Sequence, residues 1–284
     1  MNSSRLSDLE KWSAALVCGA KKELYLTPKP GLVDLANCGS HPDLSVSIME
    51  ESIGYVSDYL QAVVLSLANN EPFECQKNLG IEAEKVLFDA LATNTHKGYV
   101  FLSGMLLIAR WHAPASDENA LRTTLSKLAE GFFRAAQSGS THGQKAREKY
   151  HAGGIVQEAI KGFPALFEHA LPAFRSALRE HSSIEVASFA MLARLMQCVD
   201  DTTTLHRGGT LALSRLKRDG HELEMRIANG DDYLSYLDDL NRDYVRMNLT
   251  MGGVADMLGL AFAVLLASGE IPGESEGGWG LKAY

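Results

Sequence analysis

Acidic and basic side chains stand beside pairs of glycine at several points in this sequence, and the combination suits phosphate binding. Arg207 is followed by Gly208 and Gly209, and Asp200 and Asp201 come shortly before it. Glycine pairs that open a helix leave backbone N–H groups uncovered, so an anion can approach closely. Adjacent carboxylates suit Mg²⁺, and arginine offers paired donors to phosphate. This segment therefore indicates either a phosphate and metal site or a simple helix cap and turn.

Two further glycine pairs precede an acid. Gly252-Gly253 opens an apolar run that contains Asp256, and Gly153-Gly154 is followed by Glu158. A helix that is apolar on nearly all sides is buried, so Asp256 should have little water near it. Because an uncompensated buried carboxylate costs several kcal/mol, this residue must be ion-paired, bound to metal or substrate, or neutral.

Basic residues also stand at turns rich in proline or glycine. Lys29 lies between two prolines that stiffen the chain, with Asp34 close behind, and we expect its ammonium to be offered from a rigid loop. His41 lies in a second loop, where Asp43 is placed to cap a helix that begins near Ser45. A rigid turn between helices is the simpler interpretation of the first loop.

The segment Asn94-Thr95-His96-Lys97-Gly98 precedes an apolar run, so Asn94 or Thr95 can cap a helix whose first turn holds His96 and Lys97. Cations there oppose the helix dipole by roughly 0.3–1 kcal/mol each. A bound anion would reverse the sign of this effect. The alternative is a pair of solvated residues at a helix start.

The elements that must position these residues are helices. Leucine and alanine together number 72, whereas valine and isoleucine number 23, and unbranched side chains favour helices over sheets. Apolar residues recur at spacings of three and four, which predicts about ten helices that fold back on one another at short connections marked by proline or glycine. The predicted ranges are 6–25, 45–67, 79–92, 98–111, 119–136, 165–179, 184–198, 211–216, 233–247 and 251–267.

These helices predict an all-α protein with one compact catalytic domain over residues 1–270, whose site lies at clustered helix ends, and a glycine-rich acidic tail over 271–284. Ser138–Lys149 is long and polar enough to be a lid or a linker. A net charge of −8 argues against nucleic acid and acidic membranes as partners. No export signal and no membrane span is apparent, and four scattered cysteines suit reduced thiols, so we expect a cytoplasmic protein.

Several of these segments together resemble the triphosphoribosyl-dephospho-CoA synthase family, which acts in making the prosthetic group of citrate lyase or malonate decarboxylase. The matching segments occur in the family's order and span residues 23 to about 267. They are Thr27-Pro28-Lys29-Pro30-Gly31-Leu32-Val33-Asp34 with Gly39-Ser40-His41-Pro42-Asp43, Asn94-Thr95-His96-Lys97-Gly98, Glu158-Ala159 with Gly162-Phe163-Pro164, Asp201-Thr202 with His206-Arg207-Gly208-Gly209, and Gly252-Gly253-Val254-Ala255-Asp256.

The resemblance implies an all-helical enzyme that transfers the triphosphoribosyl group of ATP to the 2′-hydroxyl of 3′-dephospho-CoA, with adenine leaving. It implies catalytic roles for Glu158 and Asp201, with His96 protonating the departing base, and a Mg²⁺ ion held by Asp200, Asp201 or Asp256. The implied substrate-binding residues are Lys29, Asp34, His41, Asn94, Thr95, Lys97, Arg207, Gly208, Gly209, Gly252 and Gly253. The product would pass to a transferase that loads an acyl carrier protein, and the enzyme could form a homodimer.

Two other functions fit the same residues. One is the same ribosyl chemistry with a different acceptor, and the other is a helical protein that binds a nucleotide or CoA without turnover.

Overall fold

The fold consists of helices that pack around one continuous apolar core. The structure is a computed structural model, which describes residues 3–93, 95–113, 117–135 and 153–273. Within these ranges there are eleven α-helices, one π-helix and no strand, as the leucine- and alanine-rich composition predicts. They are α1 (Ser3–Tyr25), α2 (Val46–Ala68), α3 (Phe73–Leu91), α4 (Lys97–His112), α5 (Glu118–Ala135), α7 (Gly154–Ile160), η1 (Ala165–Ala170), α8 (Leu171–His181), α9 (Ile184–Cys198), α10 (Thr202–Asn229), α11 (Tyr233–Arg246) and α12 (Gly252–Ala267).

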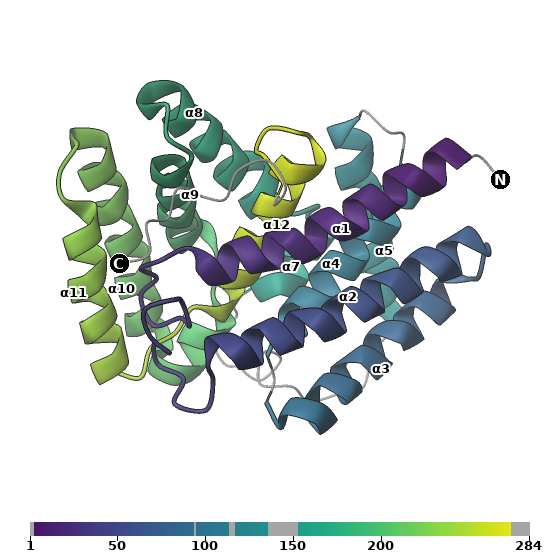
Figure 1. Cartoon of the computed structure of the whole chain (residues 1–284), viewed down its shortest axis with the longest axis horizontal. Helices are drawn as coiled ribbons and strands as arrows, with labels where there is room; N and C mark the ends of the chain where they lie inside the picture. Colours follow the sequence, from purple (N-terminus) through teal and green to yellow (C-terminus); the bar gives the residue numbers. More distant parts are fainter. Residues whose placement is uncertain (1–2, 94, 114–116, 136–152, 274–284) are drawn as a thin grey trace.

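Helix α12 lies at the centre, behind α1 in the view of Figure 1. Its residues are apolar on nearly every side and most are buried, as the sequence predicts. The two helices approach closely because glycines face each other: a Cβ on Gly19 would overlap the carbonyl oxygen of Gly259 and lie 2.8 Å from the backbone nitrogen of Ala263. This contact places the last turn of α1 near the first turn of α12, where the candidate residues gather.

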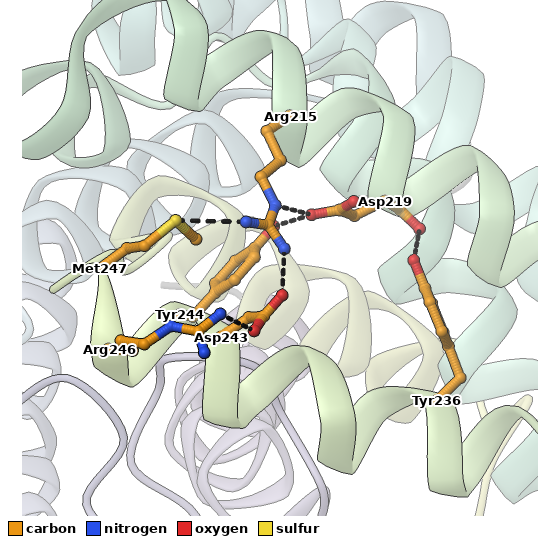
Figure 2. A network of polar contacts seen from close by, with 7 residues as sticks. All are labelled: Arg215, Asp219, Tyr236, Asp243, Tyr244, Arg246 and Met247. Atoms are coloured by element: carbon orange, nitrogen blue, oxygen red, sulfur yellow. Dashed lines mark hydrogen bonds and ion pairs between the residues drawn. The ribbon is translucent and has the colours of Figure 1, made fainter.

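A polar network holds α11 against α10. Figure 2 shows Arg215 donating to Asp243 (2.7 Å) and contacting Asp219 (3.3 Å), while the Tyr244 hydroxyl donates to Asp219 (3.0 Å). Tyr244 is almost fully buried and packs beside Gly31. Helix α11 thereby supports both the loop before α2 and the segment 248–251 that leads into α12.

The loop between α1 and α2 is tied to α11 at a glycine. Gly31 has a φ of +70°, which favours glycine, and a Cβ there would overlap the carbonyl oxygen of Leu249. Its backbone amide donates to Asn241 of α11 (2.9 Å). The loop that carries Lys29, Asp34 and His41 is thus held against the start of α12 rather than free in solvent.

Some predicted boundaries were wrong. Helix α10 runs far beyond 211–216, because its polar sequence keeps a narrow apolar stripe of Leu205, Ala212, Leu216, Leu223 and Ile227. The predicted helix over 165–179 is a π-helical turn followed by α8, which contains Pro172 in its first turn, where proline is tolerated. Ser45, not Asp43, caps α2, since its side chain accepts from the Ile48 backbone amide (3.3 Å).

Other expectations concern the surface and the ends of the chain. None of the four cysteines, all of which the structure describes, forms a disulfide. Among the helices that the structure describes, none is long and apolar enough to cross a bilayer. The proposed lid over Ser138–Lys149 and nearly all of the predicted tail, residues 274–284, lie outside the described residues, so these two expectations and the domain boundary at 270 stay predictions.

Candidate functional site

The first turns of α10 and α12 meet at a single carboxylate. Asp201 is fully buried; its Oδ1 accepts from the Thr204 backbone amide (2.7 Å) and its Oδ2 from the Val254 amide (3.0 Å). The side chain therefore caps both helices. Gly253 allows the close approach, because a Cβ there would lie 3.1 Å from Asp201 Oδ2. This geometry gives Asp201 a positioning role that the sequence alone did not predict.

The first turn of α4 meets the first turn of α12 at the side chain of Asp256, close to Asp201 at the start of α10. A Cβ on Gly98 would overlap the Asp256 carboxylate, so this glycine makes room for it. Burial raises the pKa of Asp256 well above its usual value, and the nearby negative charges of Glu23 and Asp201 raise it further, while the Tyr99 backbone amide opposes the rise. The starts of α4, α10 and α12 therefore surround a carboxylate whose ionised form is disfavoured by burial and by negative neighbours.

Lys29 belongs to this cluster but does not project from its loop into solvent. Its side chain is fully buried; the ammonium donates to the carbonyl oxygens of Glu23 and Leu24 at the end of α1 and lies 3.3 Å from Glu23 Oε1. Asp34 supports the loop, accepting from the Lys29 backbone amide (2.8 Å). The prediction that this ammonium projects from the loop was wrong. The carbonyl oxygens at the end of α1 and the buried Glu23 carboxylate attract the ammonium into the protein.

Glu23 is a site residue that the sequence analysis missed. Burial raises its pKa, and the Lys29 ammonium opposes that rise. One signal was available: Glu23 lies seven residues after Leu16 and three after Ala20, both buried, and so falls on the core face of α1. An acid on the apolar face of a helix predicts a buried carboxylate that needs a partner.

A second group of polar contacts lies at the outer edge of the same region. His41 Nε2 is 2.8 Å from Thr250 Oγ1, and Thr204 Oγ1 donates to the Thr250 carbonyl (2.7 Å). Arg207 donates to the Ser40 carbonyl (2.8 Å) and lies 3.4 Å from His41 Nδ1. Burial, with a smaller contribution from Arg207, lowers the pKa of His41 to about 4, so this imidazole is neutral at pH 7.

Gly208 and Gly209 do not open a helix as predicted; they lie inside α10. Gly209 has φ 68° and ψ −164°, which breaks the helix between a short first segment and its long remainder. This backbone conformation is essentially restricted to glycine. Arg207 is therefore on a segment whose direction differs from that of the rest of α10. By contrast, Gly252 and Gly253 do begin a helix, as predicted.

His96 and Lys97 diverge at the start of α4. The His96 Nδ1 atom is 2.7 Å from Ser52 Oγ of α2, and burial lowers the pKa of this histidine to about 4. Lys97 instead turns to α3, where its ammonium is 2.6 Å from Glu84, and its side chain is 47% exposed. That exposure leaves it accessible to a ligand. Thr95 is buried behind His96, and Asn94 lies outside the described residues.

Glu158 and Asp200 form a separate group at the end of α9. Glu158 accepts from the Ala165 backbone amide (3.0 Å), and its pKa is raised by burial and by the charge of Asp200. Asp200 pairs with Lys217 (2.7 Å), whereas Asp201 accepts from the amides of Thr204 and Val254. Within the described part of the chain, no three His, Cys, Asp or Glu side chains are arranged to hold a metal, so Asp200, Asp201 and Asp256 do not form a ready-made metal site.

A separate groove lies between α1 and α2. It is lined by apolar and polar side chains that include Ser13, Val17, Gln61 and Leu65, and it contains none of the residues singled out from the sequence. Apart from Glu158 and Asp200, the chemistry-bearing residues lie around the meeting point of three helix starts and the loop after α1.

Comparison with known proteins identifies a family. The family model of CitG, described as ATP:dephospho-CoA triphosphoribosyl transferase, matches residues 10–274, which is nearly the whole chain. No solved structure matches the chain. Because the match covers nearly the whole chain, including most of α1, all three helix starts and the loop between α1 and α2, the chain belongs to the CitG family of ATP:dephospho-CoA triphosphoribosyl transferases.

Proposed function

We propose that this enzyme breaks the bond between ribose and adenine in ATP and joins the triphosphoribosyl group to the 2′-hydroxyl of 3′-dephospho-CoA, releasing adenine. The observation that carries the proposal is the meeting of the starts of α4, α10 and α12 around Asp256. Helix N-termini carry partial positive charge and uncovered N–H groups, which suit a triphosphate. Lys97 and Arg207, at the edges of this region, would add charged donors.

The residues fit a magnesium ion that accompanies the triphosphate. The buried carboxylate of Glu23 raises the pKa of the half-buried Asp256, and the Lys29 ammonium compensates Glu23. A divalent cation would supply the positive charge that this pair lacks. Mg²⁺ takes one or two protein carboxylates and completes its shell with phosphate oxygens and water, so two are sufficient. Of the three acids expected as ligands, we retain Asp256.

Glu158 is our candidate for the base that removes the proton from the acceptor hydroxyl. Its raised pKa brings it nearer to neutrality, which suits proton transfer at physiological pH. Loss of adenine develops positive charge at the anomeric carbon, and negatively charged carboxylates stabilise such a centre. Asp201, whose oxygens accept from two helix starts, would hold the site in shape rather than react.

The downstream partner follows from the product. A ribosylated dephospho-CoA is the precursor of a prosthetic group, and we propose that it passes to the transferase that loads the acyl carrier protein of citrate lyase or malonate decarboxylase, in the cytoplasm. The four free thiols suit that compartment. The homodimer stays a prediction.

The test is to incubate the purified protein with ATP, Mg²⁺ and 3′-dephospho-CoA and to quantify adenine by chromatography and the product by mass. We expect adenine release that requires the acceptor. Release only with another acceptor would support the alternative ribosyl transferase, and ATP binding without release would support a sensor. Asp256→Asn should abolish release, whereas Asp58→Asn, at an exposed carboxylate of α2, should not change it.

A further inference from the structure

A chain of buried hydroxyl groups stands behind His96. Thr95 Oγ1 donates to Ser52 Oγ (2.8 Å), and Ser52 Oγ lies 2.7 Å from His96 Nδ1. Ser52 is fully buried and Thr95 is 6% exposed. The chain links α2 to the segment that enters α4, so it depends on how these two elements pack.

The direction of this chain determines where the imidazole carries its proton. A serine hydroxyl has one hydrogen. Ser52 Oγ accepts from Thr95, and His96 Nδ1 is the one acceptor within reach of its own hydrogen among the described residues. An N–H on Nδ1 would leave that buried hydroxyl hydrogen unbonded, so the arrangement that pairs every hydroxyl hydrogen has Nδ1 accepting with its lone pair. A neutral imidazole has a single N–H, so that hydrogen resides on Nε2.

The His96 Nε2 atom is buried, and it has no hydrogen-bond partner in the part of the chain that the structure describes. The backbone of His96 adopts a left-handed conformation (φ 51°) immediately before α4, an uncommon one for a residue with a side chain. Buried donors are rarely left unpaired, and those that are call for an explanation such as a ligand. An unused donor and a helix N-terminus at the same place point to a bound hydrogen-bond acceptor.

We propose that Ser52 and Thr95 are positioning residues that hold His96 in its Nε2–H form, and that this N–H donates a hydrogen bond to a ring nitrogen of the adenine of ATP. The identification of the acceptor as adenine rests on the function proposed above. When the bond between ribose and adenine breaks, its electron pair goes to adenine and makes the ring nitrogens better acceptors. A fixed neutral donor then stabilises the transition state more than the ground state. No proton leaves His96 in this step, in contrast to the expectation that it protonates the base. The departing adenine takes one proton from water instead, and the proton that Glu158 removes from the acceptor hydroxyl returns to water, so the transfer balances.

The positioning role is tested on the protein without ligand. Long-range ¹H–¹⁵N correlation of ¹⁵N-histidine-labelled protein reports the tautomer, and the His96→Gln variant identifies the signal. We expect Nε2–H in the wild type and a mixture in Ser52→Ala and Thr95→Val, with Thr95→Ser restoring the single form. Ser103→Ala is the matched control, since it removes an equally buried hydroxyl, one that donates to the Tyr99 carbonyl of its own helix.

Adenine release tests the catalytic consequence. We expect kcat to fall about tenfold or more in Ser52→Ala and Thr95→Val, with the KM for ATP changed less than about twofold, and Thr95→Ser to recover. If Ser52→Ala fails to fold, the two Thr95 variants decide. A wild-type Nδ1–H tautomer, or full kcat in Thr95→Val, would overturn the inference. If the wild type releases no adenine, the proposed function fails, while the tautomer measurement still decides the positioning role.

Discussion

Asp201 accepts a hydrogen bond from the backbone amide of Val254, 53 residues further along the chain, and in this way one carboxylate joins the first turns of two helices. Helix α12 has no side-chain cap at the residue that precedes it, so this long-range contact takes the place of a local one. The shape of the candidate site therefore depends on a residue that we do not expect to react.

Replacing Asp201 with alanine should reduce stability by about 2–4 kcal/mol, because two caps are lost and the amides of Thr204 and Val254 become buried without partners. Urea unfolding measures this loss. Asp232→Ala removes a single exposed cap, that of α11, and should cost clearly less. Equal losses of unfolding free energy in the two variants would show that the link between α10 and α12 adds nothing to stability.

Lys29→Met should destabilise the protein by about 3–5 kcal/mol, because it leaves Glu23 buried without its counter-ion. The double variant Glu23→Gln/Lys29→Met should recover part of that loss in chemical unfolding. Lys77→Met, which removes an ion pair to the more exposed Glu74, should change stability by less than about 1 kcal/mol. A double variant no more stable than Lys29→Met would contradict the coupling of the two buried charges.

Lys97→Ala should raise the KM for ATP by about 10- to 100-fold, the effect of losing one hydrogen bond from a charged group to phosphate. Stability should change by less than about 1 kcal/mol, because the pair with Glu84 is partly exposed. Lys127→Ala, at an exposed position of α5, serves as the control. An unchanged ATP dependence would remove Lys97 from the site.

Gly98→Ala should abolish adenine release and lower the thermal midpoint, because the added methyl group would overlap the Asp256 carboxylate. Gly54→Ala is the matched control: this glycine of α2 has open space around it, and alanine there should stabilise the protein by about 0.5–1 kcal/mol. Full activity in the Gly98 variant would mean that the carboxylate can move without consequence.

Stability should fall as the pH drops from 6.5 to about 4. Burial lowers the pKa of both His41 and His96 to about 4, so in this window the unfolded chain binds protons that the folded chain does not. Each histidine contributes a slope of up to about 1.4 kcal/mol per pH unit. Urea midpoints measured at pH 7 and pH 5 should show a smaller drop in His41→Asn than in the wild type, and an unaltered drop in His221→Gln, which changes an exposed histidine.

The sequence predicts the elements of this fold better than the directions of its side chains. Helix α9 and the buried helix α12 follow from their apolar spacing, because burial of one face determines where a helix forms. The inward turn of Lys29 and the separation of Asp200 from Asp201 could not be predicted, since each depends on which partner tertiary packing brings near. Glu23 was predictable in principle from its position on the core face of α1.

The break at Gly209 divides α10 into two parts with separate tasks. The short part contacts Ser40, Asn248 and Thr250 around the candidate site, whereas the long part is joined to α11 by the network of Arg215 and Asp219. The backbone of a single residue thus sets the angle between the segment at the candidate site and the helix that supports it. Substitutions that straighten this joint would misdirect the Arg207 guanidinium without removing any of the groups that bind or react.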